Sequence, residues 1–221
     1  MDAELFPRDR TRLAPGAVHV PDWLAPQRQT TLVAACRDWA RPPAGLRTVR
    51  TPGGGTMTAR QVCLGLHWYP YAYARTVVDG DGAPVKPFPA WLDALARDAV
   101  ADALGPDAVP PEPYDIALIN FYDGDARMGM HRDADERSDA PVVSLSLGDT
   151  CVFRFGNTGT RTRPYTDVEL RSGDLFVFGG ASRLAFHGVP RVHPGTAPPG
   201  LGLTGRLNIT LRVSGLPGEA T

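Results

Sequence analysis

Residues 205–213 read Gly205-Arg206-Leu207-Asn208-Ile209-Thr210-Leu211-Arg212-Val213, and their pattern decides the fold. Apolar and polar side chains alternate strictly: one face carries Leu207, Ile209, Leu211 and Val213, and the other carries Arg206, Asn208, Thr210 and Arg212. Because successive side chains of a strand point to opposite faces, the alternation predicts a β-strand with a buried apolar face. An ordinary amphipathic strand leaves its polar face in water. Two arginines on one face also suit an elongated dianion, since each guanidinium binds a carboxylate with two hydrogen bonds.

The chain before this strand is expected to form further strands. Turn residues such as Gly148-Asp149 and Gly179-Gly180 separate five β segments, which are residues 115–122, 142–147, 151–155, 167–170 and 175–178. A short strand is also expected at residues 17–20.

Two helices are expected ahead of most of these strands. The first covers residues 26–40 and ends before Pro42-Pro43. The second begins near Pro89 and ends at Gly105-Pro106; its inward side chains are expected to be Trp91, Leu92, Leu95, Ala99 and Ala103. Residues 44–88, rich in glycine and aromatic side chains, are expected to be irregular.

This order of elements predicts an α+β, mainly β fold: a double-stranded β-helix, or jelly roll, with N-terminal helices buttressing one face. The apolar face of residues 206–213 would then contact the helices, and its polar face would point into the mouth of the barrel. The chain of 221 residues suits a single domain, residues 1–221.

Composition excludes some classes of protein. The net charge of −1 provides no global field for nucleic acid, so any such binding must use local patches. No apolar run approaches transmembrane length, and the acidic N-terminus lacks the apolar segment of a signal peptide. Cys36, Cys63 and Cys151 have no metal-type spacing and are expected to be reduced thiols. A cytoplasmic monomer without a membrane or protein partner is expected.

Candidate metal ligands lie in Met130-His131-Arg132-Asp133-Ala134-Asp135-Glu136. Residues i and i+2 of an extended segment share a face, so His131 and Asp133 can reach one point in space. With a second, distant histidine they would form the facial triad of non-haem Fe(II) oxygenases, which leaves coordination positions open. The His-x-Asp pattern also occurs by chance on solvated loops, so it is weak evidence by itself.

The second histidine is expected to be His187. It follows the segment 175–178, which Gly179-Gly180 turns back, although a lone histidine is more often structural. His193, beside Pro194, is interpreted as a loop residue. A facial triad beside a dicarboxylate site is typical of a 2-oxoglutarate-dependent dioxygenase.

These residues together resemble the AlkB family of Fe(II)/2-oxoglutarate-dependent nucleic-acid dealkylases, and most closely its bacterial DNA repair members. The resemblance covers most of the chain and includes the segments Thr51-Pro52-Gly53-Gly54, Leu118-Ile119-Asn120-Phe121-Tyr122, His131-Arg132-Asp133-Ala134-Asp135-Glu136, Ser144-Leu145-Ser146-Leu147-Gly148, Gly179-Gly180-Ala181-Ser182-Arg183-Leu184 and Arg206-Leu207-Asn208-Ile209-Thr210-Leu211-Arg212. Three positions depart from the bacterial pattern: Gly55, Ala134 and Phe178.

The resemblance implies the residues that bind each group. Iron would be held by His131, Asp133 and His187. The cosubstrate 2-oxoglutarate would be bound by Asn120, Tyr122, Asn208, Arg206 and Arg212. A jelly-roll core at residues 114–213 and a nucleotide-recognition lid at residues 44–88 are also implied.

The implied substrate is an N-alkylated base of DNA, 1-methyladenine or 3-methylcytosine, preferably in a single strand, giving formaldehyde, succinate and CO₂. The base would stack on Trp68, with Tyr73, Asp135 and Arg161 as further contacts. The lid aromatics could equally form a small satellite core, Arg161 could be a solvated loop arginine, and Glu136 could be an ordinary surface residue.

Two other functions remain open from the sequence. One is a 2-oxoglutarate oxygenase that acts on RNA, a protein or a small molecule. The other is a catalytically silent jelly-roll module that binds a metal for structure.

Overall fold

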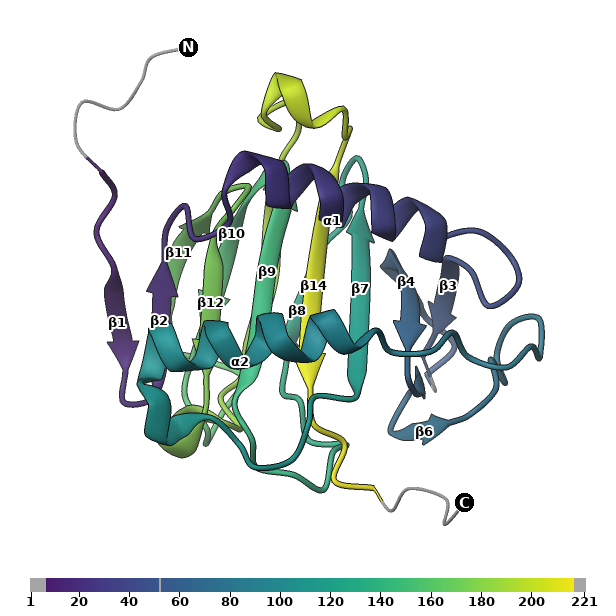
Figure 1. Cartoon of the computed structure of the whole chain (residues 1–221), viewed down its shortest axis with the longest axis horizontal. Coiled ribbons are helices and arrows are strands. Elements are labelled where there is room, and N and C mark those ends of the chain that lie inside the picture. Colours follow the sequence, from purple (N-terminus) through teal and green to yellow (C-terminus); the bar gives the residue numbers. More distant parts are fainter. Residues whose placement is uncertain (1–6, 52, 217–221) are drawn as a thin grey trace.

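A computed structural model of the chain describes residues 7–51 and 53–216. Two antiparallel sheets form its body (Figure 1). The larger sheet has the strand order β1 (Thr11–Ala14), β2 (Ala17–Val20), β12 (Leu175–Phe178), β9 (Val142–Gly148), β14 (Arg206–Arg212), β7 (Ile116–Tyr122), β4 (Thr56–Leu64), β3 (Arg47–Arg50). The smaller sheet has the order β11 (Thr166–Leu170), β10 (Thr150–Phe155), β13 (His187–His193), β8 (Met128–His131).

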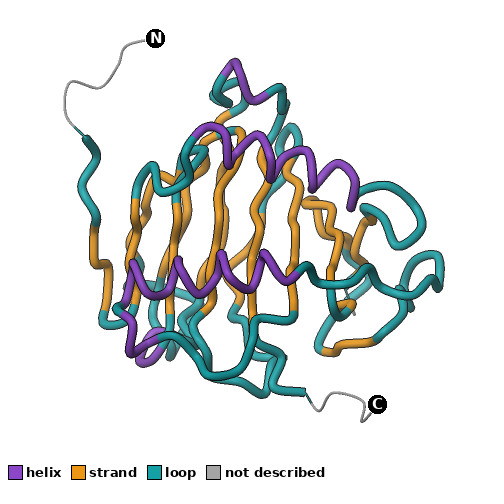
Figure 2. Tube along the Cα trace, viewed as in Figure 1, coloured by secondary structure: helices purple, strands orange, loops and turns teal. Residues whose placement is uncertain are grey.

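The two helices both cover the outer face of the larger sheet, as Figures 1 and 2 show for α1 (Pro26–Trp39) and α2 (Ala90–Leu104). Residues 7–51 and 53–216 also contain three short 3₁₀ turns: η1 (Pro106–Ala108), η2 (Gly180–Ser182) and η3 (Pro199–Leu201). The predicted fold class, a mainly β jelly roll with buttressing N-terminal helices, is confirmed. Among the described residues, no helix is both long and apolar enough to cross a membrane.

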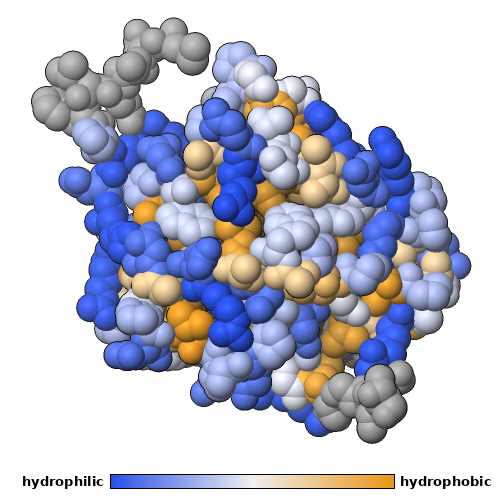
Figure 3. Space-filling model, viewed as in Figure 1, coloured by the Kyte–Doolittle hydropathy of each residue, from blue (hydrophilic) through white to orange (hydrophobic). Residues whose placement is uncertain are grey.

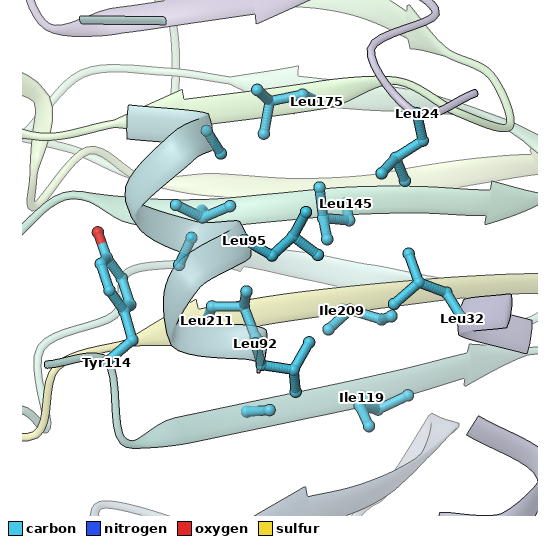
Figure 4. Close-up of a cluster of buried hydrophobic side chains, with 14 of the residues drawn as sticks. Leu24, Leu32, Leu92, Leu95, Tyr114, Ile119, Leu145, Leu175, Ile209 and Leu211 are labelled. Atoms are coloured by element: carbon cyan, nitrogen blue, oxygen red, sulfur yellow. The ribbon is translucent and has the colours of Figure 1, made fainter. Parts of the chain in front are cut away.

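The larger core lies between the helices and this sheet. Figure 4 shows Leu92 and Leu95 of α2 close to Ile209 and Leu211 of β14. All four side chains are almost fully buried, which is the source of most of the stability in such a layer. The apolar face of the arginine strand therefore contacts the helices, as predicted. Figure 3 shows this side of the molecule with polar side chains over most of its surface.

One helix prediction is wrong. Trp91 was expected to face inward, yet 40% of it is exposed. Its ring instead stacks on that of Trp39 in α1, with a centroid distance of 5.9 Å. The position lies at the edge of the apolar stripe of α2, where a large ring reaches the neighbouring helix and the core residue is Leu92.

The expectation that residues 44–88 are irregular is also wrong. β3 and β4 extend the larger sheet beyond β7, and Ala59 and Val62 of β4 are buried. A separate hairpin follows, formed by β5 (His67–Tyr69) and β6 (Ala72–Ala74). We call it the β5–β6 hairpin. Of the motif Thr51–Gly54, Pro52 lies outside the described residues.

The inner face of the larger sheet carries a row of polar side chains across its centre. In the register of β14 with its neighbours, Asn208 lies opposite Asn120 of β7 and Ser146 of β9. Arg206 lies opposite Tyr122 of β7. Around this row the second core packs between the two sheets, and it includes Phe153 and Phe155 of β10 together with Phe176 and Phe178 of β12. The polar face of the arginine strand therefore points into the space between the sheets, as predicted.

Candidate active site

Two strands of the smaller sheet bring two histidines together. His131 ends β8, His187 begins β13, and the two residues are register partners. Gly188 permits this close pairing, because a Cβ there would lie 2.8 Å from the carbonyl oxygen of Met128. The imidazole centroids lie 4.4 Å apart.

Asp133 completes the cluster. Its Oδ1 lies 3.7 Å from His131 Nε2, and its Oδ2 lies 3.7 Å from His187 Nε2. One ligand atom from each of the three residues lies within 4.8 Å of the other two. The structure therefore brings together the three residues that the sequence predicts as metal ligands.

The backbone sets which imidazole nitrogens are free. His131 Nδ1 lies 3.0 Å from the carbonyl oxygen of Gly129, and His187 Nδ1 lies 3.0 Å from that of Ala185. A carbonyl oxygen only accepts hydrogen bonds, so each Nδ1 carries the proton. Both Nε2 atoms then present lone pairs toward Asp133, which is how metal-binding imidazoles are held by their outer partners.

The electrostatics keep this cluster ready for a cation. Burial, together with the neighbouring His131, lowers the pKa of His187 to about 4, so its imidazole is neutral at pH 7. Burial alone would raise the pKa of Asp133, but the positive charge of Arg212 beside it contributes most to lowering it, to about 2. Two imidazole nitrogens and one carboxylate form the donor set that non-haem Fe(II) prefers.

Arg206 is a buried cation with little to neutralise it. It is 1% exposed, and its Nη2 donates to Ser146 Oγ at 3.0 Å. Its Nη1 makes only a long contact of 3.5 Å with the carbonyl oxygen of Asp149, and its Nε has no partner. No carboxylate of the described part of the chain forms an ion pair with it. Since a buried charge is costly unless it is paired, this guanidinium fits an anion from outside the chain.

Arg212, by contrast, sits between two carboxylates. Its Nη2 lies 2.7 Å from Asp133 Oδ2, and its Nη1 donates to Glu136 Oε1 at 2.8 Å. Asp133 Oδ2 accepts no well-aligned hydrogen bond despite this short distance. Burial by itself lowers the pKa of Arg212, but the two carboxylates raise it, so the guanidinium stays charged. Its Nε also lacks a partner.

The remaining predicted cosubstrate residues line a small inner cavity of about 30 Å³ beside the triad. Asn208 Nδ2 donates to Ser144 Oγ at 2.7 Å, and Asn120 Oδ1 accepts from Gln61 Nε2 at 3.1 Å. The hydroxyl of Tyr122 lies 3.7 Å from Met128 Sδ. This volume alone is too small for a five-carbon dicarboxylate.

A larger cavity of about 520 Å³ lies outside the triad. Its wall includes three of the predicted substrate contacts: Trp68, Asp135 and Arg161. Trp68 Nε1 donates to Asp135 Oδ2 at 2.8 Å, which holds the indole of the β5–β6 hairpin against the loop after β8. Arg161 lies with its guanidinium 5.7 Å from the ring centre of Phe186.

Tyr73, the fourth predicted substrate contact, faces elsewhere. It does not line the larger cavity; its hydroxyl donates to Glu136 Oε1 and lies 3.4 Å from Arg212 Nη1. The exposed aromatic residue of this hairpin is Tyr71, which does line the cavity and is 76% exposed. Its φ of 70° is unusual for a residue with a side chain. The sequence signal for it was the Tyr69-Pro70-Tyr71-Ala72 turn, because proline is favoured at the second position of a β-turn.

Two further residues with buried side chains were given no role from the sequence: Glu136, whose place was left open, and Arg183. The side chain of Glu136 is 0% exposed, so the alternative that it is an ordinary surface residue is wrong. Arg183 donates from Nη2 to Glu136 Oε2 at 3.0 Å and from Nη1 to the carbonyl oxygen of Asp133 at 2.7 Å. Nothing in the local sequence shows that Arg183 and Arg212 converge on Glu136, because the three residues come from separate segments.

The two cavities meet at the triad. Both are lined by Asn120, Met128, His131, Asp133 and Arg212. The donor set of the triad fits Fe(II), and the uncompensated Arg206 beside polar amide groups fits one end of a dicarboxylate. A molecule in the larger cavity would therefore lie next to a metal held by the triad.

Comparison with known proteins gives consistent matches. A family model described as the 2OG-Fe(II) oxygenase superfamily matches residues 16–212. An AlkB homolog from Caulobacter vibrioides, named as an alpha-ketoglutarate-dependent dioxygenase, is 38% identical over 90% of this chain and 88% of its own length. AlkB of Escherichia coli is 36% identical over 76% of this chain and 77% of its own.

The chain also matches proteins that are named for N(6)-methyladenine, a base other than the 1-methyladenine and 3-methylcytosine expected from the sequence. ALKBH1D of Arabidopsis thaliana, named as a DNA N(6)-methyladenine demethylase, is 33% identical over 90% of this chain. The chain spans about half the length of this protein and of its relative ALKBH1C. The solved structure of OsALKBH1 superposes with a TM-score of 0.81 at 34% identity, covering 92% of this chain and all of that one.

Proposed function

This chain belongs to the 2OG-Fe(II) oxygenase superfamily and, within it, to the AlkB family, and on that premise we propose that it removes alkyl groups oxidatively from damaged bases of DNA. The substrates would be 1-methyladenine and 3-methylcytosine, preferably in single strands, where unstacking a base costs less. Fe(II), 2-oxoglutarate and O₂ supply the oxidation in this superfamily. One methyl group would leave as formaldehyde for each 2-oxoglutarate converted to succinate and CO₂.

The observation that carries the proposal is the shared floor of the two cavities. His131, Asp133 and Arg212 line both the larger cavity and the inner one. The larger cavity, about 520 Å³, lies within the range of about 300–1,000 Å³ for small-molecule sites. A flipped base in it would place its alkyl group at the triad while its phosphates stay outside.

We assign the metal to His131, Asp133 and His187, whose free Nε2 atoms and carboxylate face one point. We assign the distal carboxylate of 2-oxoglutarate to Arg206, since that guanidinium lacks an anionic partner in the described chain. Arg212, Asn120, Tyr122 and Asn208 would position the rest of the cosubstrate, because they line the inner cavity or adjoin it.

The base itself would stack on Trp68, with His131 on the other side. Asp135 would meet the exocyclic amine, and its carboxylate favours a base made cationic by N-alkylation. Arg161 and Arg132 both lie over Phe186 at the cavity wall and suit the flanking phosphates. Tyr73 would act from behind the wall, through Glu136, and Tyr71 would replace it as the exposed aromatic contact.

A second candidate substrate is N6-methyladenine in DNA, the base in the names of the Arabidopsis relatives. This base is neutral, so it gains less from Asp135 than a cationic base does. A relative from Pyricularia oryzae is named as an N6-methyladenosine RNA demethylase, so RNA belongs in the same comparison.

The test is product release from oligonucleotides with one defined lesion. We expect formaldehyde and succinate in equal amounts from single-stranded DNA that contains 3-methylcytosine, and only with Fe(II) and 2-oxoglutarate present. Matched strands would carry 1-methyladenine, N6-methyladenine, or the same lesions in RNA. Alanine at His131 or Asp133 should abolish release; turnover that survives either change contradicts the ligand assignment.

The outcomes separate the other functions. Succinate without formaldehyde from any strand would indicate an oxygenase for a protein or a small molecule. If neither product forms, and Fe(II) raises the melting temperature but added 2-oxoglutarate raises it no further, the chain is a silent metal-binding module.

A further inference from the structure

The loop after β8 contains a buried carboxylate, Glu136, which has no role yet in binding the metal, the cosubstrate or the base. Glu136 lies three residues after Asp133, and its side chain is 0% exposed. Three groups converge on it: Arg183 Nη2 at 3.0 Å, Arg212 Nη1 at 2.8 Å and the hydroxyl of Tyr73. Each comes from a different part of the chain, so Glu136 joins the segment before β13, the arginine strand and the β5–β6 hairpin.

The charges of this cluster balance. Asp133 and Glu136 are two carboxylates, and Arg183 and Arg212 are two guanidiniums, all with side chains no more than 7% exposed. Buried charges are stable only when they are paired, and removing one partner leaves another without compensation. Loss of the Glu136 charge would therefore redistribute the remaining pairs.

Arg212 is the group whose ion pairs would change. It now divides its two terminal nitrogens between Glu136 and Asp133. Without the carboxylate of Glu136, the guanidinium has one buried anion left, and two-point pairing with Asp133 is its best available geometry. That pairing would occupy the oxygens of Asp133 that face the two imidazoles.

We propose that Glu136 is a positioning residue for the metal and cosubstrate site. It binds one terminal nitrogen of Arg212, so that Asp133 stays available as a metal ligand. Through the hydroxyl of Tyr73 it also connects Arg212 to the β5–β6 hairpin. The inference rests on the proposed roles of Asp133 and Arg212. It extends them by explaining the position of Arg212 through its ion pair with Glu136, a residue that lines neither of the two cavities at the triad.

Glutamine cannot replace Glu136 in this position. Its amide has one acceptor oxygen, whereas both carboxylate oxygens of Glu136 accept from charged donors. An amide nitrogen would face either Arg183 or Arg212, donor against donor. Tyr73→Phe is the complementary change, since it removes only the hydroxyl between the hairpin and Glu136 and leaves both ion pairs in place.

Asp174 offers a matched control. Its side chain is also 0% exposed, it pairs with Arg8 at 2.6 Å, and it contributes to neither cavity at the triad. Asp174→Asn is therefore the same chemical change, a buried carboxylate to an amide, away from the site.

The experiment measures binding without turnover. Calorimetry with Mn(II), and then with 2-oxoglutarate, is run on the full chain and on Glu136→Gln, Tyr73→Phe and Asp174→Asn, and hydrogen exchange is followed at residues 67–74. We expect Glu136→Gln to weaken both ligands by about tenfold or more and to speed exchange in the hairpin. Tyr73→Phe should keep both affinities and speed only hairpin exchange, and Asp174→Asn should lower the melting temperature alone.

Wild-type affinities in Glu136→Gln would overturn the proposal, as would an equal loss in Asp174→Asn, because that loss would follow from general destabilisation. Tighter 2-oxoglutarate binding in Glu136→Gln would also overturn it, since Glu136 would then act only by its charge. Should this variant fail to fold, Glu136→Asp keeps the charge but is one methylene too short, and wild-type Mn(II) affinity in it would refute the positioning role. No nucleic acid is present, so a failed dealkylation assay with these results intact would overturn the proposed substrate and leave the inference standing.

Discussion

We propose that Arg206 serves to bind a ligand rather than to stabilise the fold. Its charge is buried in the inner face of the larger sheet beside Ser146, with an unpartnered Nε. We expect Arg206→Met to raise the KM for 2-oxoglutarate by about 10- to 100-fold, since hydrogen bonds to charged groups contribute about 1.5–3 kcal/mol. The same variant should be at least as stable as the wild type without cosubstrate, because it removes an uncompensated charge.

Steady-state kinetics measures the expected rise in KM for 2-oxoglutarate, and urea unfolding measures whether the stability without cosubstrate is maintained. The control is Arg154→Met, which removes a surface arginine paired with Asp167 and should change neither quantity much. A lower stability of Arg206→Met in the absence of 2-oxoglutarate would contradict our view of this charge.

Asp135 gives the second prediction at this scale. Its carboxylate lines the larger cavity and accepts from Trp68 Nε1. Asp135→Asn keeps an acceptor for the indole but loses the charge. We expect kcat/KM to fall by about tenfold on cationic 3-methylcytosine, and to change far less on neutral N6-methyladenine, because only the former is attracted by the carboxylate. Equal losses on both bases would show that Asp135 acts through Trp68 alone.

Single residues also show where sequence reasoning stops. His131 and Asp133 were found because two positions of an extended segment share a face. Glu136, three positions on, was open to a surface interpretation because its partners are Arg183 and Arg212, far away in sequence. A long-range ion pair leaves no local periodicity, and so no local pattern reports it.

At the scale of elements, the strands that the sequence predicts best are those with one apolar face and one polar face. β14 alternates strictly, and both its apolar and its polar side were predicted correctly. β8 and β13 were missed: β8 spans only four residues, and β13 contains Pro190. β8 is a strand through its pairing with β13 at the triad, and β13 pairs with β10 as well. β3 and β4 were missed because glycines and aromatic residues around them resemble a loop.

The turn of the β5–β6 hairpin holds Tyr71 in a conformation that favours glycine, with φ at 70°. We expect Tyr71→Gly to change the free energy of unfolding by less than about 1 kcal/mol, because relief of backbone strain offsets the greater chain entropy of glycine. The KM for oligonucleotide should nevertheless rise, since the exposed ring is lost. Tyr71→Asn, which also tolerates this conformation, is the control for the backbone, and an unchanged KM in both would remove Tyr71 from the substrate contacts.

At the scale of the whole molecule, Asp174 ties the start of the described chain to the larger sheet. It accepts from Arg8 and from the backbone nitrogens of Asp22 and Arg171, and its Oδ2 lies 2.9 Å from His19 Nε2. Burial alone would raise its pKa, but these partners lower it to about 2. Since the folded pKa lies below the unfolded one, the carboxylate stabilises the fold fully above about pH 4 and loses this effect as the pH falls toward about 2.

We therefore expect Asp174→Asn to reduce the free energy of unfolding by about 2 kcal/mol at neutral pH, with a shrinking difference from wild type in acid. Chemical denaturation at pH ~7 and at pH ~3 measures both numbers. A difference that stays constant between these pH values would show that the amide acts through packing and not through charge.

The pairing of His131 with His187 has a mechanical meaning beyond catalysis. β8 is an edge strand whose only ladder in its sheet is with β13, and a register irregularity interrupts that ladder. An ion bound to both imidazoles would link two distant points of the folded chain, and it would stabilise their pairing by its binding free energy, because the site exists only in the folded state. Bound iron would therefore hold β8 and β13 together, and its loss would remove this link. A molecule that lost its iron would loosen first along the strand that bears the ligands, and would present a free edge to proteases before the helix-backed core had opened.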